Sequence, residues 1–341
     1  MRYRLATGLA IGLMMTGWAM AATNPEAQIS NGQIAMKVYL PDAKDGYYRG
    51  TRFDWSGVVY SLTAHGHEYY GPWFDKTDPG VHDFIYQGEH IVAGPCSAIT
   101  GPVDEFQQMG WDEAKPGGTF IKIGVGALRK PAEGKYDNYH LYEIANVGKR
   151  TFHEADGALE FTQELSDVNS GYGYVYQKTL RLTPGKAQMV LEHRLTNTGK
   201  RAIHSNVFNH NFLVLDKQTT GPDFVITVPF AIHSAQPPNR ELAAIRGKEI
   251  VYLKRLEGHD TVATPLEGFG GSASDNEFRA ENRRVGAGIK MVADRPLLKE
   301  SLWSIRSVLA VEPFVAIDVE PGQTFTWTST YDYYVLSGII Q

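Results

Sequence analysis

The chain has 341 residues, a formal net charge of −5 and a single cysteine, Cys96. The acidic balance leaves no basic face for nucleic acid. One cysteine cannot form an internal disulfide, so the hydrophobic core must hold the fold, and we interpret Cys96 as a small buried apolar residue rather than a nucleophile. The 18 tyrosines and six tryptophans suit a sugar-binding cleft, although β-rich proteins are rich in aromatic residues in any case.

The first residues predict an export signal. Met1-Arg2-Tyr3-Arg4 is basic, the segment from Leu5 to Met20 is apolar, and Ala19-Met20-Ala21 offers a small-residue cleavage site. We therefore expect a signal peptide over residues 1–22, cleaved after Ala21 or Ala22, and a periplasmic or secreted mature protein. The apolar run is too short and too interrupted by glycine for a membrane anchor, and no membrane association is expected after cleavage.

The predicted elements that follow are almost all strands. Alternating apolar and polar residues bounded by turn residues favour strands over residues 33–40, 57–62, 119–125, 159–165, 174–182, 189–195, 225–228, 314–319 and 325–334. The one helical candidate is Arg240 to Arg246. Two loop-rich segments, Gly71 to Gly118 and Pro265 to Arg284, are long enough to suggest a functional role.

This pattern predicts an all-β fold. Many short strands at spacings of about 8–15 residues are typical of an antiparallel sandwich or barrel. The βαβ units of a nucleotide-binding α/β fold are missing. No linker, charge block or internal repeat divides the chain, so we expect a single domain over residues 24–341.

The most informative segment is Ile203 to Asp216, in which Asn209, His210 and Asn211 stand together beside an apolar run. Polar groups in such a place need hydrogen-bond partners or a ligand, which makes His210 the first candidate for a functional residue.

Glu312 is the second candidate, because it stands inside the apolar run Val308 to Val315. Burial would raise its pKa and bring it nearer to the range of a general base. The alternative is an edge-strand or loop position of Glu312, since a proline follows it.

A segment near the start, residues 46–55, carries Arg49 and Arg52 among aromatic side chains. Guanidinium groups in such surroundings suit sugar hydroxyls or a carboxylate, so Arg52 is a candidate ligand-binding residue. A surface pair between Arg52 and Asp54 is the alternative.

Four histidines raise the question of a metal site. His65 and His67 stand two residues apart, on one face of an extended segment, and His82 and His90 follow. Because the sequence has no H-E-x-x-H motif and no cysteine cluster, we expect turn or surface histidines and predict no metal, with a zinc or iron site as the less expected alternative. G-x-S-x-G and Walker motifs are also absent, so neither an activated serine nor a nucleotide is expected.

The order of these motifs resembles the galactose mutarotase-like superfamily, which includes the aldose 1-epimerases. Asn209 to Leu213 is similar to the family segment that carries a catalytic histidine, and Pro321 to Phe325 with Tyr331 to Tyr333 is similar to its closing strands. Glu312 stands where the family has its catalytic glutamate, upstream of the closing turn. The sequence departs from the family around Arg52, where the N-R-I motif is missing, and a second family histidine has no counterpart.

The resemblance implies a large antiparallel β-supersandwich and a periplasmic aldose 1-epimerase that interconverts sugar anomers without a cofactor. Glu312 would take a proton from the anomeric hydroxyl and a protonated His210 would give one to the ring oxygen, with the two facing each other across the pyranose. The residues expected to bind the sugar are Arg52, Asn209, Asn211, Trp55 and Trp73.

Two alternatives remain open. One is a non-catalytic carbohydrate-binding protein on the same fold. The other, less expected, is a lyase or isomerase of an unusual sugar that uses the histidines at 65, 67, 82 and 90.

Overall fold

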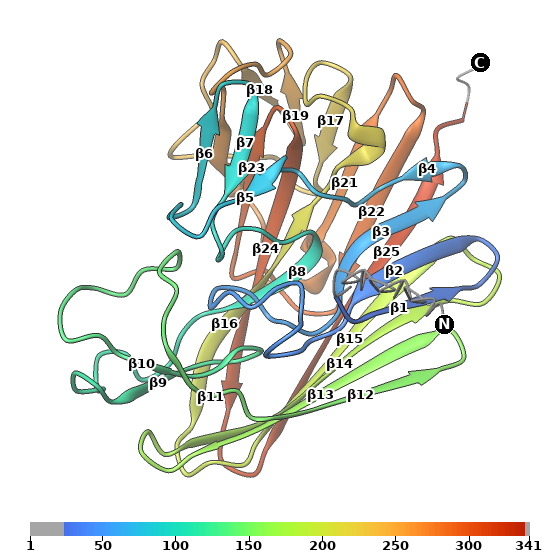
Figure 1. Cartoon of the computed structure of the whole chain (residues 1–341). Coiled ribbons are helices and arrows are strands. Elements are labelled where there is room, and N and C mark those ends of the chain that lie inside the picture. The colour runs from blue at the N-terminus through green and yellow to red at the C-terminus, as the bar shows by residue number, and fades with distance from the viewer. Residues whose placement is uncertain (1–23, 338–341) are drawn as a thin grey trace, which may run out of the picture.

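The computed structural model describes residues 24–337. Within them the chain forms 25 strands and two short 3-10 helices, η1 (Leu215–Lys217) and η2 (Ala273–Asp275) (Figure 1). The predicted signal peptide, residues 1–22, lies outside the described residues and stays a prediction. No helix between residues 24 and 337 is long and apolar enough to cross a membrane.

The largest sheet has ten strands, and each pairs antiparallel with its neighbours. Its long strands alternate buried and more exposed residues, as a sheet with one covered face requires. In spatial order the strands are β12 (Lys149–Ala155), β13 (Ala158–Asp167), β14 (Tyr172–Leu182), β15 (Gln188–Asn197), β25 (Thr324–Val335), β22 (Ala287–Ala293), β21 (Glu277–Asn282), β17 (Phe224–Thr227), β19 (Glu249–Tyr252) and β18 (Ala243–Arg246).

A five-stranded antiparallel sheet is the second main layer. Most residues of its two longest strands are buried, and one of its faces packs on the ten-stranded sheet. In spatial order the strands are β20 (Val262–Pro265), β23 (Lys299–Ile305), β24 (Val308–Val319), β16 (Ile203–Phe212) and β8 (Gly101–Phe106).

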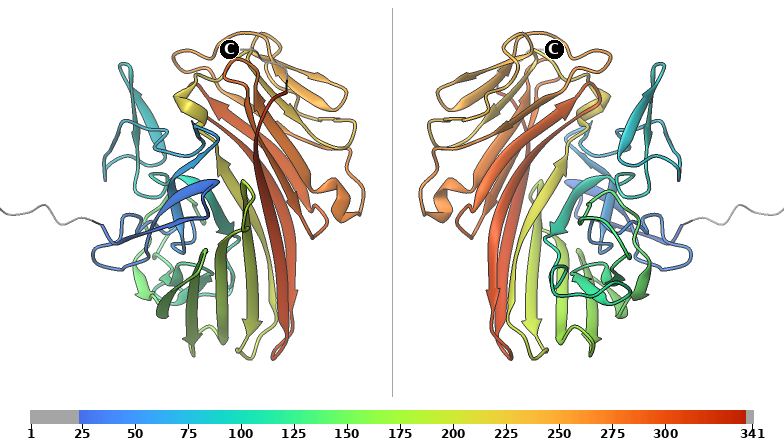
Figure 2. Two further views of the ribbon diagram at one scale, coloured as in Figure 1. Left: turned by 90° about the vertical axis from the view of Figure 1, so that its right-hand side faces the viewer. Right: turned by 90° about the vertical axis from the view of Figure 1, so that its left-hand side faces the viewer.

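Three smaller sheets lie beside these layers (Figure 2). Their pairings are antiparallel except for β5 with β7, which is parallel. The first contains β1 (Glu26–Ser30), β2 (Ile34–Tyr39), β3 (Val58–Ala64) and β4 (His67–Glu68). The other two contain β11 (Ile144–Asn146), β10 (Gly126–Arg129) and β9 (Thr119–Lys122), and β5 (Lys76–Thr77), β7 (His90–Ala93) and β6 (Phe84–Gln87).

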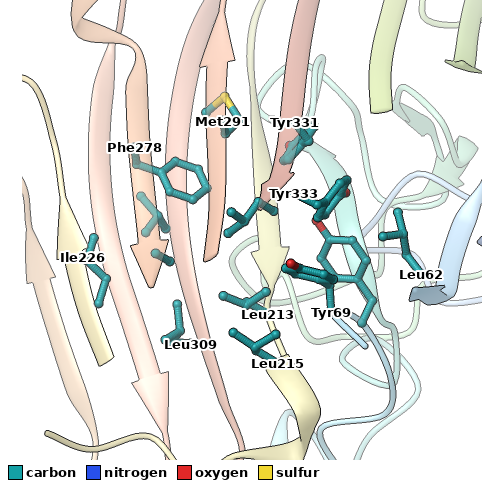
Figure 3. Packing of buried hydrophobic residues seen from close by; sticks show 14 of the residues in the cluster. Leu62, Tyr69, Leu213, Leu215, Ile226, Phe278, Met291, Leu309, Tyr331 and Tyr333 are labelled. Atoms are coloured by element: carbon teal, nitrogen blue, oxygen red, sulfur yellow. The ribbon is translucent and has the colours of Figure 1, made fainter. Parts of the chain in front are cut away.

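The largest hydrophobic cluster lies between the two main sheets. Figure 3 shows Phe278, Met291 and Tyr331 of the ten-stranded sheet in the same interior as Leu213 and Leu309 of the other layer. Each fully buried side chain of this kind contributes about 1.5–3 kcal/mol relative to an exposed one. Burial of apolar side chains between the sheets therefore stabilises the fold, as expected for a chain whose described residues hold one free cysteine.

The all-β, antiparallel prediction is confirmed, and one element of it is wrong. The segment from Arg240 to Arg246 is not helical: Ala243–Arg246 forms strand β18, which pairs with β19 at the edge of the large sheet. About two helical turns are too short to be stable alone, so the pairing partner determines the conformation. Cys96 is a free, fully buried thiol, as interpreted from the sequence.

Candidate active site

His210 and Glu312 occupy neighbouring central strands of the five-stranded sheet. Strand β16 pairs with β24 in a register that sets Phe208 against Phe314, and the same register continues to a bridge between Leu213 and Leu309. His210 therefore lies directly across from Glu312. Their side chains meet on the same face of the sheet, with His210 Nε2 3.0 Å from Glu312 Oε1.

The imidazole of His210 is enclosed by aromatic rings. It stacks on Phe212 with a centroid separation of 3.7 Å and meets the edges of Phe53 and Trp303 at 5.7 and 5.8 Å. Its Nδ1 is buried and has no hydrogen-bond partner among residues 24–337. Burial, together with the positive charge of Arg52, lowers the pKa of His210 well below its usual value, so the ring is neutral at neutral pH.

Glu312 is held at a higher pKa than an ordinary glutamate. Burial raises the pKa of Glu312 to about 7, against the opposing effects of a hydrogen bond from Ser301 and the charge of Arg52. The Ser301 hydroxyl donates to Oε2 at 2.8 Å from the next strand, β23, where it faces Glu312 in register. Near pH 7 the carboxyl group therefore exchanges a proton readily.

A cavity of about 740 Å³ lies over this pair. Its volume is within the range of about 300–1,000 Å³ typical of small-molecule sites. Aromatic side chains of Trp73, Phe84 and Trp303 contribute to the wall, and Arg52 and Tyr139 close one side. A cavity with aromatic walls and a titratable floor can bind a sugar and move its protons.

Arg52 is fixed in this wall by its partners. Its Nε donates to Glu105 Oε2 on β8 at 2.6 Å, and its guanidinium lies over the rings of Phe53 and Tyr139 at 4.4 and 4.8 Å. The alternative pair with Asp54 does not form, because Asp54 is buried beside Lys178. Arg52 lines the cavity, and its role in binding a ligand stays a prediction.

Comparison with known proteins rests on structure alone. No family model and no curated protein matches the sequence. The fold is similar to the Slr1438 protein from Synechocystis sp. PCC 6803, with a TM-score of 0.56 and 12% identity over 94% of this chain and 100% of that one. It is also similar to the GalM/aldose epimerase homologue from C. elegans, with a TM-score of 0.53 and 12% identity over 93% and 100% of the two chains.

A galactose mutarotase-like protein from Lactobacillus casei ATCC 334 matches with a TM-score of 0.50 and 13% identity over 91% of this chain and 100% of that one. The chain has the galactose mutarotase-like fold. The predicted fold class is confirmed, and at these identities the likeness concerns the fold and not the activity.

The structure places His210 and Glu312 side by side, whereas the sequence analysis expected them on opposite sides of a sugar ring. A pyranose cannot lie between two side chains whose atoms are 3.0 Å apart. Adjacent strands are only about 4.8 Å apart, so cross-strand neighbours touch. Both groups instead form the floor of one cavity. The lowered pKa of His210 opposes its expected role as a charged acid, whereas the raised pKa of Glu312 is the direction expected from its burial. The edge-strand alternative for Glu312 is excluded, because β24 lies between β23 and β16.

Asn209 and Asn211 do not line this cavity. Their side-chain oxygens lie 2.9 and 2.8 Å from the hydroxyl of Tyr331, and Asn209 also donates to Asp104 at 3.2 Å. Successive residues of a strand point to opposite faces, so the neighbours of His210 face the ten-stranded sheet. The structure therefore assigns them to packing between the sheets rather than to sugar binding.

Of the two tryptophans expected at the site, only Trp73 lines the cavity. Trp73 lines the cavity and stacks on Phe212 at 5.8 Å. Trp55 is fully buried in a hydrophobic cluster, where its indole N–H donates to the backbone oxygen of Gly50 at 2.8 Å and Arg150 covers its ring. Trp55 is therefore placed in the core.

Three of the four histidines considered for a metal site each contact a different aspartate. His67 contacts Asp216 at 2.7 Å, His82 contacts Asp137 at 2.6 Å and His90 approaches Asp75 at 3.8 Å. His65 occupies a turn with a positive φ of 52°. Among residues 24–337 no group of three or more potential metal ligands comes together.

Sequence reasoning missed several residues of the site, namely Asp83, Tyr139, Ser301, Trp303 and Glu105. Ser301 and Trp303 are two apart on β23 and share the face of Glu312, so alternation along 299–305 could have linked them to each other. It could not have linked them to Glu312, because that requires the register between β23 and β24.

Proposed function

We propose that this protein is an aldose 1-epimerase that interconverts the anomers of a sugar. The observation that carries the proposal is the buried His210–Glu312 pair, 3.0 Å apart, on the floor of an aromatic-walled cavity. The two oxygens that exchange protons in this reaction, the anomeric O1 and the ring O5, are bonded to the same carbon. Two adjacent protein groups are therefore suitably placed to serve both.

In the proposed reaction Glu312 starts protonated and His210 starts neutral. Glu312 gives its proton to O5 while His210 Nε2 accepts the proton of O1, and the C1–O5 bond breaks to leave an open-chain aldehyde. Rotation about C1–C2 presents the other face of the carbonyl. The reverse transfers then close the ring and restore both groups, without a cofactor. Each partner of such a pair typically contributes about 10²–10⁴-fold to the rate.

In the opposite assignment Glu312 is the base and His210 the acid, and the pair of side chains holds the same number of exchangeable protons. Either way the active pair holds one proton, so the pH profile reports the pair and not one residue. Because the pKa of Glu312 is about 7, we expect kcat/KM to fall as the pH rises through about 7 and the pair loses its proton. Nitrogen chemical shifts of His210 below pH 7 would distinguish the assignments, since only the proposed one has a neutral ring.

Polarimetry tests the activity. Glu312→Gln and His210→Gln are each expected to lower the mutarotation rate of α-glucose or α-galactose by at least about 100-fold, with unchanged circular dichroism. His204→Gln and Glu320→Gln are matched controls, because both residues are exposed and His204 lies on the same strand as His210. Wild-type rates in both site variants would contradict the proposal.

A carbohydrate-binding protein without turnover is the second candidate. The observation that favours it is the direct contact of His210 with Glu312, which occupies part of the hydrogen-bonding capacity of each group before any ligand arrives. Sugar binding detected by calorimetry, together with spontaneous mutarotation rates in the presence of the protein, would support this function instead.

We also propose that the mature protein is periplasmic or secreted, on the basis of the basic start and apolar segment of residues 1–22. Its partner in this proposal is a small sugar or oligosaccharide.

A further inference from the structure

We propose that the cavity binds two linked sugar rings, so that the ligand is the reducing end of an oligosaccharide rather than a free hexose. This inference rests on the proposed function, because it places the reacting ring over His210 and Glu312. A second ring would then lie over strands β23 and β20, at the far end of the same cavity.

The floor of the cavity extends further on one side of the acid–base pair than on the other. Glu312 lies on β24, and the sheet continues through β23 to β20, whose Ala263 and Pro265 line the cavity. Two strand spacings correspond to about 10 Å. On the other side only β8 remains, at about 5 Å, and there Arg52, which contacts Glu105 of β8 at 2.6 Å, lines the cavity.

The volume agrees with two rings. The covalently bonded non-hydrogen atoms of a hexose each occupy less than the about 30 Å³ of a water molecule in the liquid, so a hexose fills at most about half of the 740 Å³ cavity. A ligand site normally buries most of its ligand. The remaining half is therefore room for a second ring of similar size.

The far end is a built wall and not a loose loop. His233 and Glu267 exchange two backbone hydrogen bonds, of 2.7 and 2.9 Å, which add a bridge beyond β20. The carboxylate of Glu267 accepts from the backbone N–H of Ala235 at 3.0 Å. The Thr264 hydroxyl donates to the backbone oxygen of Gln236 at 3.0 Å and lies 3.0 Å from the hydroxyl of Ser234. These contacts hold residues 233–236 against 264–267.

The chemistry of this end suits a sugar ring. Pro265 and Phe269 supply apolar surface, and Leu298, which is 49% exposed, continues it toward the rim. Gln236 and Glu267, both exposed, stand beside them. Apolar surface covers the C–H faces of a pyranose, while amide and carboxylate groups bind its hydroxyls.

The test compares one ring with two. The mutarotation rate of glucose is measured by polarimetry and compared with the rates of maltose, cellobiose and lactose, each of which ends in a reducing glucose. The Kd of each of the four sugars is measured by calorimetry. We expect at least one disaccharide to exceed glucose about tenfold in kcat/KM and in affinity. Equal values for glucose and all three disaccharides would overturn the inference while leaving the proposed function intact.

A blocking variant locates the second ring. Ala235→Trp places a large side chain in the far end, and we expect it to lower the disaccharide-to-glucose ratio of kcat/KM at least about tenfold. Ala132→Trp is the matched control, because Ala132 is also exposed and does not line the cavity. An unchanged ratio in Ala235→Trp would overturn the inference.

Failure of the proposed function has a different signature. If no sugar is turned over, the epimerase proposal fails. The two-ring cavity is then tested by binding alone, through the ratio of the calorimetric Kd values of disaccharide and glucose. This ratio is compared between the wild-type protein and Ala235→Trp. Absence of both turnover and binding for all four sugars would overturn both proposals.

Discussion

At the scale of single residues, the raised pKa of Glu312 links activity to stability. The folded protein holds the Glu312 proton up to a pH of about 7, whereas the usual pKa is 4.5. Between these values the folded state binds more protons than the unfolded state. The free energy of unfolding therefore falls as the pH rises through this window, because ionising a buried carboxyl group is costly.

This linkage predicts that Glu312→Gln stabilises the protein above neutral pH. At about 1.4 kcal/mol for each pKa unit, the buried carboxylate costs about 3 kcal/mol at pH 8, and the neutral amide avoids that cost. Urea unfolding at pH 8 is expected to show a gain of up to this size, and at pH 4.5 little change. The exposed Glu320→Gln is the control, and a loss of stability at pH 8 in Glu312→Gln would contradict the account.

At the scale of elements, strand β8 is held from both faces. Glu105 contacts Arg52 at 2.6 Å and Lys122 at 3.3 Å on the cavity side. On the other side Asp104 contacts Lys178 at 2.7 Å and His193 at 3.1 Å, within the layer that faces the ten-stranded sheet. Although burial alone would raise it, these partners hold the pKa of Asp104 below its usual range.

The buried pair predicts a large effect of Lys178→Met. Lys178 also approaches Asp54 at 3.5 Å, and its side chain is 1% exposed. Its loss therefore removes the cation that the buried carboxylates of Asp54 and Asp104 share. Removing one partner of a buried pair costs about 3–5 kcal/mol, and urea unfolding measures it. Lys149→Met is the matched control, because its pair with Glu164 is exposed and such pairs contribute about 0–1 kcal/mol. Equal effects of the two substitutions would refute a structural role for the buried pair.

At the scale of the whole molecule, the site is assembled from distant parts of the chain. Arg52, Trp73, His210 and Glu312 come together because β16 and β24 are adjacent strands of one sheet. The segment between β2 and β3 brings Arg52 to the same cavity, and the segment between β4 and β5 brings Trp73. Such a site depends on the complete stack of sheets, so it forms only when the whole domain folds.

Export is predicted to remove the first 21 or 22 residues. N-terminal sequencing of protein from an exporting host should begin at Ala22 or Thr23, because small residues precede both bonds. A mature protein that retains Met1 would contradict the predicted signal peptide. Replacing Ala19 and Ala21 by Leu should block cleavage after Ala21, and the shift in mass reports it.

The positions of strands could be predicted because the signal is local. An alternation such as that of residues 159–165 is visible in any short window, and β13 spans it. The wrong prediction of a helix at 240–246 shows where local pattern is insufficient. Residues 243–246 form a strand because they pair with β19. The positions of Asn209 and Asn211 were open to the same alternation argument, which places them opposite His210.

The sequence by itself determined the all-β class, the resemblance and the choice of His210, Glu312 and Arg52, because these depend on residue type and short-range pattern. Only the tertiary structure decided that His210 touches Glu312, that Trp73 and not Trp55 lines the cavity, and that β23 and β20 extend its floor. The physical reason is register: a shift of one residue between two strands reverses every side chain, and the contacts that fix it lie about a hundred residues apart in the chain.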